Sequence, residues 1–114
     1  MIRAALIGFT ISAAAPVFAQ PEAPNFRYAI VVGNAEYEHM PALPNPDADA
    51  DLVASFLEDA GYIVIQENNL TREGFEQFFR GVIQGLPEDS EVLFYYSGHG
   101  FQIGASNYLI PVDA

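Results

Sequence analysis

The sequence contains no cysteine and no lysine. Without cysteine the chain can form no disulfide and no thiolate metal site, and it lacks one class of catalytic nucleophile. Its 4 basic residues are outnumbered by 15 acidic ones, which gives a formal net charge of −11. This composition argues against nucleic acid as a partner, because nucleic-acid binding requires clustered positive charge. A cationic substrate or a divalent cation would suit the acidic surface better.

The amino terminus has the features of a secretory signal over residues 1–19. Arg3 provides the positive start, residues 4–15 provide an apolar segment, and residues 17–19 provide a cleavage site with small residues at the key positions. The apolar segment is too short to span a bilayer. We therefore expect an exported protein, periplasmic or secreted, that is not an integral membrane protein. An uncleaved membrane anchor is the alternative.

The rest of the chain is expected to form one domain over residues 27–114, after a proline-rich linker at 20–26. Apolar, β-prone runs predict buried strands, and amphipathic segments predict helices. In chain order these are a strand at 28–32, a helix at 46–60, a strand at 62–65, a helix at 72–86 and a strand at 91–96. This order predicts an α/β fold, with a mostly parallel sheet, right-handed crossovers and helices on both faces.

The first helix is expected to begin at Asn45 and Pro46, an amide cap followed by proline at the first helical position. Its apolar face is formed by Ala48, Leu52, Val53, Phe56, Leu57 and Ala60. Asp49 falls in the middle of this face, whereas Asp47 and Asp51 project toward solvent. Because an unpaired buried charge is costly, the Asp49 carboxylate should either line a polar pocket or cap N–H groups of a neighbouring loop.

The second helix and the segment after the last strand make further predictions. The helix carries a stripe that is expected to pack in the core, formed by Phe75, Phe78, Phe79, Val82, Ile83 and Leu86. Residues 101–103 and 107–110 predict a hairpin. The strand at 91–96 then has no further neighbour, so the isolated chain is expected to be poorly stable or to associate through that exposed edge.

The last strand runs into the turn Ser97-Gly98-His99-Gly100, in which a histidine stands between two glycines. Histidine is easily tuned to act near neutral pH, so His99 is either a reactive group or a decoration of the turn. Parallel strands all end on one edge of their sheet, and ligands bind there. We therefore expect Asp49 and His99 to be neighbours in one site. His39, in the loop at 35–44, is expected to be plainly solvent-exposed.

Five segments carry a family resemblance: Arg27-Tyr-Ala-Ile-Val-Val-Gly-Asn34, Asn45-Pro-Asp-Ala-Asp-Ala50, Gly61-Tyr62, Phe94-Tyr-Tyr-Ser-Gly-His-Gly100 and Asn107-Tyr-Leu-Ile-Pro-Val-Asp113. Together they resemble the caspase-like cysteine peptidases (clan CD, C14), in particular the prokaryotic metacaspase-like p20 domains. The resemblance covers residues 27–114 in the family's order. It implies a caspase-like three-layer sandwich, incomplete at its carboxyl-terminal side, that needs no cofactor and acts on peptide or protein substrates.

The resemblance also implies roles for individual residues. His99 would be the catalytic imidazole that works with a cysteine thiolate and protonates the leaving amine. The N–H of Gly100 would form part of the oxyanion hole. Asp49 and Ser97 would line the S1 pocket, which implies a preference for Arg or Lys at P1. True caspases bind a P1 aspartate through an arginine, and residues 42–47 contain none.

The sequence departs from the family at the nucleophile. The family's cysteine follows the next strand, and these 114 residues stop before it. Ser97 is a poor substitute, because it lies two residues from His99 in the same turn and the family does not use it as nucleophile. We therefore expect the amino-terminal part of an exported cysteine endopeptidase that is inactive as this chain alone. Its partners would be the missing carboxyl-terminal part of the domain or a second copy.

The alternative function is a non-catalytic caspase-like interaction or scaffold module, which the loss of the cysteine would fit. Calcium stimulation is known in the metacaspase family and suits an acidic surface, but the sequence has no EF-hand loop, so no metal is assigned.

Overall fold

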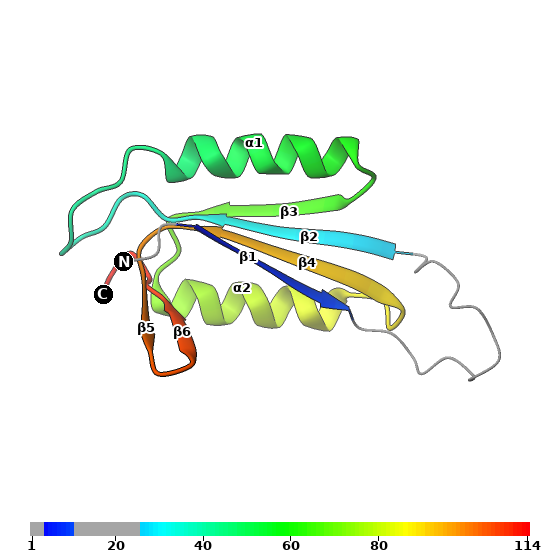
Figure 1. Cartoon of the computed structure of the whole chain (residues 1–114). Coiled ribbons are helices and arrows are strands. Elements are labelled where there is room, and N and C mark those ends of the chain that lie inside the picture. Colours follow the sequence, from blue (N-terminus) through cyan, green and yellow to red (C-terminus); the bar gives the residue numbers. More distant parts are fainter. Residues whose placement is uncertain (1–3, 11–25) are drawn as a thin grey trace.

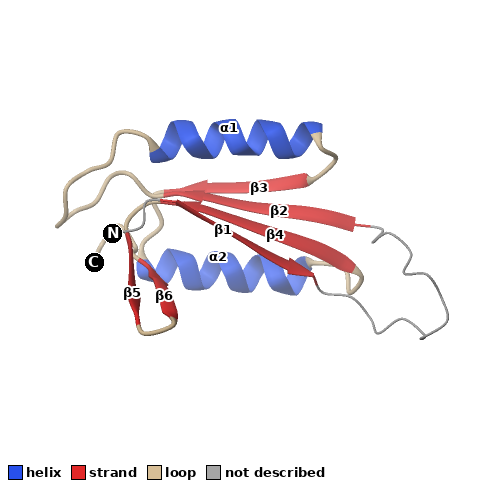
Figure 2. Cartoon of the chain, in the orientation of Figure 1, coloured by secondary structure: helices blue, strands red, loops and turns tan. Residues whose placement is uncertain are grey.

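The computed structural model describes residues 4–10 and 26–114 (Figure 1). The elements in chain order are β1 (Ala4–Thr10), β2 (Phe26–Gly33), α1 (Pro46–Asp59), β3 (Ile63–Asn68), α2 (Arg72–Gly85), β4 (Ser90–Ser97), β5 (Gly100–Ile103) and β6 (Ser106–Leu109). Within the described ranges, no helix is both long enough and apolar enough to cross a membrane. Figure 2 separates the helices from the strands.

The main sheet has the strand order β1-β4-β2-β3, and β5 and β6 form a separate hairpin. Strands β4, β2 and β3 run parallel, whereas β1 pairs antiparallel with β4. Helix α1 covers one face of the sheet and α2 covers the other (Figure 1). The predicted α/β fold, with a mostly parallel sheet between helical layers, is therefore confirmed.

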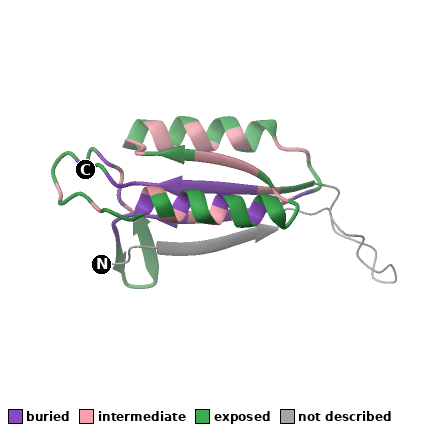
Figure 3. Cartoon of the chain, turned by 90° about the horizontal axis from the view of Figure 1, so that it is seen from above, coloured by how far each residue is buried: buried purple, intermediate pink, exposed green. Residues whose placement is uncertain are grey.

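The central strand β2 supplies both halves of the core, because successive side chains of a strand point to opposite faces. Ala29 and Val31 pack on the α1 side, and Ile30 and Val32 pack on the α2 side. All four side chains are buried, and Figure 3 shows this burial concentrated in the middle of the sheet. The continuous apolar run of this strand is thus explained by burial on both faces.

Helix α1 packs on the sheet through only part of the predicted face: Leu57 is buried and Val53 packs against the same core cluster, but the rest differs. Its buried residues are Pro46, Ala50, Ala54 and Leu57. Leu52 and Phe56, which the prediction placed in the core, are 72% and 70% exposed. Small side chains allow a close approach: a Cβ on Gly33 would lie 2.8 Å from the carbonyl oxygen of Pro46. The helix is therefore rotated relative to the prediction, so that Ala50 and Ala54 face the strands with Leu57 while Leu52 and Phe56 face outward.

The caps of the two helices give opposite outcomes. Pro46 begins α1 as predicted, but the side chain of Asn45 makes no capping hydrogen bond. Thr71 caps α2 as an extended residue whose hydroxyl accepts the N–H of Gly74 at 3.0 Å.

The predicted stripe of α2 packs on the sheet through Phe75, Phe78, Phe79, Val82 and Leu86. Ile83 is the exception, because it is 58% exposed.

The outer edge of β4 is not bare, contrary to the prediction. Strand β1 pairs with it over its length, from Ala4 opposite Ser97 to Thr10 opposite Glu91. The edge was expected to be free because β1 coincides with the apolar segment of the expected secretory signal. The remaining residues of that signal, 1–3 and 11–19, lie outside the described residues, as do linker residues 20–25.

Candidate active site

The candidate site lies at the edge where the parallel strands β2 and β4 end. The chain leaves β2 at Gly33 and leaves β4 at Ser97, two residues that pair across the sheet. The N–H of Asn34 donates to the carbonyl oxygen of Ser97 at 2.8 Å, which ties the two exits together. Helix α1 begins above this edge, and the β5–β6 hairpin leaves from it (Figure 1). These segments are the ones that the topology was expected to collect.

His99 is buried at this edge, and its two ring nitrogens have different environments. Nε2 lies 2.9 Å from the carbonyl oxygen of Pro41. A carbonyl oxygen can only accept, so Nε2 carries the ring hydrogen in the neutral imidazole and donates it. Nδ1 is buried and has no hydrogen-bond partner among the described residues. In the neutral imidazole, Nε2 therefore donates a hydrogen bond to the protein, whereas Nδ1 keeps a lone pair that no described residue uses.

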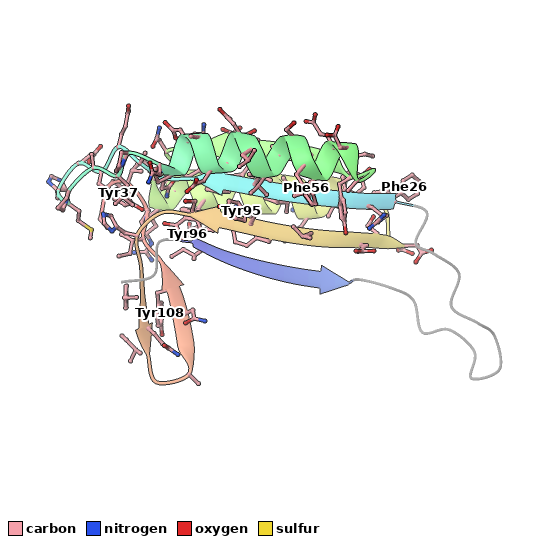
Figure 4. The ribbon with its side chains drawn as sticks, turned by 45° about the horizontal axis from the view of Figure 1, so that its top comes forward. Phe26, Tyr37, Phe56, Tyr95, Tyr96 and Tyr108 are labelled. Carbon is pink, nitrogen blue, oxygen red and sulfur yellow. The ribbon has the colours of Figure 1, made fainter. Side chains whose placement is uncertain are left out.

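The main chain of His99 is held by residues distant in sequence. Its N–H donates to the Tyr37 hydroxyl at 2.8 Å. Its carbonyl oxygen accepts the Tyr96 hydroxyl at 2.7 Å and the N–H of Ile110 at 3.0 Å. Figure 4 shows Tyr37 and Tyr96 at the end of the sheet from which the hairpin leaves. A Cβ on Gly98 would collide with the Tyr96 hydroxyl, so this glycine leaves room for the tyrosine pair.

Asn34, directly after the end of β2, makes hydrogen bonds to two segments of the chain around the site. It is fully buried, and its Oδ1 accepts the N–H of Leu70 at 2.9 Å. Its Nδ2 donates to the carbonyl oxygen of Ile110 at 3.3 Å. One amide side chain thus joins the segment before α2 to the segment after β6. Buried polar groups need such partners, because water cannot replace them.

The N–H of Gly100 points away from the hairpin partner. Hydrogen-bonded and non-hydrogen-bonded pairs alternate along an antiparallel ladder. The N–H of Ile110 bonds the carbonyl oxygen of His99, so the next pair, Gly100 and Leu109, is of the non-hydrogen-bonded kind. The backbone N–H that follows the histidine is therefore directed outward from β6 at the site.

Asp49 and Ser97 meet beside the histidine turn. The Ser97 hydroxyl, almost fully buried, lies 3.5 Å from Oδ2 of the half-buried Asp49. Tyr95, two residues before Ser97 on the same face of β4, is close to both. Burial raises the pKa of the Tyr95 hydroxyl; its hydrogen bond with Ser97 lowers this pKa, and the Asp49 charge raises it. These groups form a polar, negatively charged cluster at the start of α1.

Asp47 differs from its prediction. It was expected to project toward solvent, but it is half-buried, and its Oδ1 has no hydrogen-bond partner among the residues that the structure describes. The cause is the rotation of α1, which turns Pro46 and Ala50 toward the sheet and moves Asp49 from the centre of the packed face to its margin. Asp51, by contrast, is exposed as predicted and accepts a hydrogen bond from Gln66 at 2.8 Å.

All four predicted site residues lie at this one edge: Asp49, Ser97, His99 and Gly100. His39 is exposed, as predicted, and its Nε2 lies 3.8 Å from the Glu38 carboxylate. Sequence reasoning missed four residues that shape the site: Asn34, Tyr37, Pro41 and Tyr96. Only the unusual length of the loop at 35–44, which carries two of them, was a signal that could have found them.

The fold and the site together define an α/β domain that presents a buried histidine at the carboxyl edge of a mostly parallel sheet. A family model for the caspase domain matches residues 26–114. The chain therefore belongs to the caspase domain family of C14 peptidases.

Two curated proteins are similar in sequence to this chain. One is the mucosa-associated lymphoid tissue lymphoma translocation protein 1 of Homo sapiens, 27% identical over 88 residues that cover 77% of this chain. The other is its Mus musculus homolog, with the same identity and coverage. The match spans 11% of the length of each relative, so the likeness concerns one segment of those proteins.

Proposed function

We propose that the chain is the amino-terminal portion of an exported caspase-like cysteine endopeptidase, carrying the catalytic histidine and receiving its nucleophile from outside these 114 residues. The observation that carries this proposal is the open Nδ1 of His99, a buried lone pair with no use in the described fold. A buried acceptor without a partner costs free energy, and a reacting group that it serves explains why such an acceptor is kept. With no cysteine in its sequence, the 114-residue chain should be inactive alone.

The chemistry follows from the two nitrogens of the imidazole. Nδ1 accepts the proton of a thiol, and the resulting thiolate attacks the scissile carbonyl carbon. As the tetrahedral intermediate collapses, Nδ1 returns that proton to the leaving amine and the acyl-enzyme remains. Water then hydrolyses the acyl-enzyme and regenerates the thiol. The Pro41 carbonyl oxygen holds Nε2–H throughout and stabilises the positive charge on the ring.

The N–H of Gly100 would stabilise the oxygen that becomes negative in this reaction. It is directed away from β6 and comes directly after the residue that bears the imidazole. A fixed backbone donor of this kind acts only on charge that develops in the transition state, so it accelerates the reaction without tightening substrate binding.

The cluster of Asp49 and Ser97 supports a preference for Arg or Lys at P1. A carboxylate at a half-buried position beside a serine hydroxyl can bind a guanidinium or ammonium group through charge-assisted hydrogen bonds. The net charge of −11 would also favour the approach of basic peptides. A P1 aspartate would meet a carboxylate there instead of a cation.

The test is to express the gene from its start codon to its natural stop codon and to assay peptides with Arg, Lys or Asp at P1. We expect cleavage after Arg and Lys that is abolished by thiol alkylation and by His99→Ala. Asp49→Asn should raise KM for the Arg peptide, whereas Asp51→Asn, on the exposed side of α1, should not. Cleavage that survives His99→Ala, or that prefers Asp, would contradict the proposal. Export is tested separately by locating the product and sequencing its amino terminus.

A second candidate function is a non-catalytic interaction module, which two observations favour. The sequence has no cysteine, and the hairpin presents an apolar face on which Phe101 and Tyr108 stack at 4.9 Å while remaining about half exposed. The DNA downstream of codon 114 distinguishes the two functions. An in-frame cysteine codon supports the peptidase, and an immediate stop codon supports the module.

A further inference from the structure

We infer that Tyr37 and Tyr96 are positioning residues that hold His99 so that Nδ1 faces the reacting group. This inference rests on the role proposed for His99. The two tyrosines come from segments far apart in the chain, the loop after β2 and the end of β4. Their hydroxyls lie 3.0 Å apart, and both are buried against the main chain of the histidine turn.

The tyrosine pair completes the hydrogen bonding of the His99 main chain. The N–H of His99 is satisfied by Tyr37 at 2.8 Å, and its carbonyl oxygen is satisfied by Tyr96 at 2.7 Å and by the N–H of Ile110 at 3.0 Å. No polar main-chain group of the histidine is left to bind water. The peptide unit before the Cα of His99 is held through its N–H and the one after it through its carbonyl oxygen, so neither rotates freely and the Cα–Cβ direction of His99 is fixed.

The proton count requires both hydroxyls. Each phenol has one hydrogen, and carbonyl oxygens only accept. Tyr96 donates its hydrogen to the carbonyl oxygen of His99, and Tyr37 accepts the His99 N–H. The Tyr37 hydrogen can then go to the carbonyl oxygen of Ile110 or to the Tyr96 oxygen, each 3.0 Å away. Burial raises the pKa of Tyr96, and the neighbouring Tyr37 hydroxyl raises it further, which keeps the Tyr96 hydroxyl protonated as a donor. A phenylalanine at either position leaves a buried main-chain group of His99 with one partner fewer.

Tyr37 also contacts the imidazole itself. Its ring centroid lies 4.6 Å from that of His99, with the planes inclined at 59°. The Pro41 carbonyl oxygen holds Nε2 from the same loop. One residue thus fixes the main chain of His99 through its hydroxyl and the ring of His99 through its aromatic face. Removing the hydroxyl alone and removing the whole ring should therefore have separable effects.

The experiment uses NMR on the 114-residue chain and needs no catalysis. The first measurement is the hydrogen-exchange rate of the His99 amide. The second is the resonance of the Nε2 proton, which is visible only when that proton is buried and hydrogen-bonded. The variants are Tyr37→Phe, Tyr96→Phe and Tyr37→Leu, and the matched control is Tyr62→Phe, which removes a bonded hydroxyl at the opposite end of the sheet.

Tyr37→Phe should accelerate exchange of the His99 amide about tenfold or more relative to Tyr62→Phe, as expected for the loss of one buried hydrogen bond, and should keep the Nε2 proton visible. Tyr96→Phe should accelerate it less. Tyr37→Leu should lose the Nε2 resonance. Equal effects of Tyr37→Phe and Tyr62→Phe on the amide, or an unchanged Nε2 resonance in Tyr37→Leu, would overturn the inference. If Tyr37→Leu does not fold, the amide exchange of Tyr37→Phe decides.

A kinetic measurement on the complete gene product separates this inference from the proposed function. Tyr37→Phe should lower kcat and leave KM for an Arg peptide unchanged, because the buried Tyr37 hydroxyl bonds the His99 main chain and not the Asp49–Ser97 cluster proposed to bind P1. An unchanged kcat would overturn the positioning role. If the NMR results hold and the product has no peptidase activity, the proposed function fails while the positioning of the imidazole stands.

Discussion

The two ends of the parallel strands make similar contacts in different surroundings. At the amino end, the Arg27 guanidinium donates to the Tyr62 hydroxyl at 3.0 Å, and this hydroxyl donates to Glu91 at 2.9 Å. The side chains of Arg27 and Glu91 are 42% and 29% exposed. At the carboxyl end, Asn34 and His99 make hydrogen bonds of comparable length but are buried. Water can replace the partly exposed hydrogen bonds at the amino end but not the buried ones at the carboxyl end. Only the carboxyl end therefore holds its side chains in one fixed arrangement.

The largest expected effect concerns strand β1, which pairs with β4 from its amino end to its carboxyl end. Deletion of residues 1–19, the expected processing event, would leave the outer edge of β4 without a partner from Glu91 to Ser97. Unpaired strand edges associate, so we expect oligomers in sedimentation velocity, whereas the 114-residue chain should be monomeric. A monomeric, cooperatively melting deletion product would show that the edge does not need β1.

Asn34→Ala should be the most destabilising point substitution at the carboxyl end. It leaves the buried N–H of Leu70 and the carbonyl oxygen of Ile110 each without this partner, a loss of about 3 kcal/mol in the free energy of unfolding. Urea denaturation measures it. Asn107→Ala, on the exposed hairpin, serves as the control and should change stability by less than about 0.5 kcal/mol. Equal losses for the two would remove the distinction between buried and exposed amides.

Gly98→Ala should cost about 2 kcal/mol, because the new methyl group collides with the Tyr96 hydroxyl and comes within 2.8 Å of the Tyr37 hydroxyl. Gly81→Ala is a matched control in the exposed part of α2, where a Cβ would meet no atom within 4 Å. That variant should gain about 0.5–1 kcal/mol from helix propensity. Opposite signs in urea denaturation would confirm the crowding at Gly98, and a gain at both positions would refute it.

The alkaline limb of stability should report the buried Tyr96. Burial raises its pKa above the ordinary value of 10.0, so above that pH the unfolded chain loses a proton that the folded chain keeps. Stability therefore falls as the pH rises, by about 1.4 kcal/mol per pH unit for one such proton. Tyr96→Phe should show a shallower fall between pH 10 and 11. Identical slopes for the two proteins would mean that Tyr96 titrates in the folded state as it does in the unfolded chain.

The smallest effect belongs to the amino end. Arg27→Ala removes the contact with Glu91 at 3.7 Å and the guanidinium placed 4.3 Å from the centroid of the Tyr62 ring. Both groups are partly solvated, so we expect a loss of about 0.5 kcal/mol in thermal or urea unfolding, smaller still at high salt. A loss as large as that of Asn34→Ala would break the comparison between the two ends.

For residues 26–114 the sequence predicted the elements, the sheet type and the edge that holds Asp49 and His99, because hydrophobic periodicity is a local pattern and the order of the elements then implies a parallel sheet. It mispredicted part of the packed face of α1, because Ala50 looks less hydrophobic than Leu52 and Phe56 and gains its place through close approach to Gly33.

The hydrogen-bond partners of the site were beyond any local pattern. Tyr37 and His99 are 62 residues apart, and Asn34 and Ile110 are 76 apart, so each pairing depends on the complete fold. The β1 pairing was missed for a different reason. Residues 4–10 match the apolar part of a secretory signal and also have the length and apolar character of a sheet strand, so the local pattern does not distinguish the two roles.

The most direct test is the pair of ¹⁵N chemical shifts of the neutral His99 imidazole, measured in the 114-residue chain. We expect a protonated Nε2 that donates to the Pro41 carbonyl oxygen, and an Nδ1 with the shift of a free lone pair. A protonated Nδ1, or two averaged shifts from a ring that exchanges tautomers, would contradict this expectation.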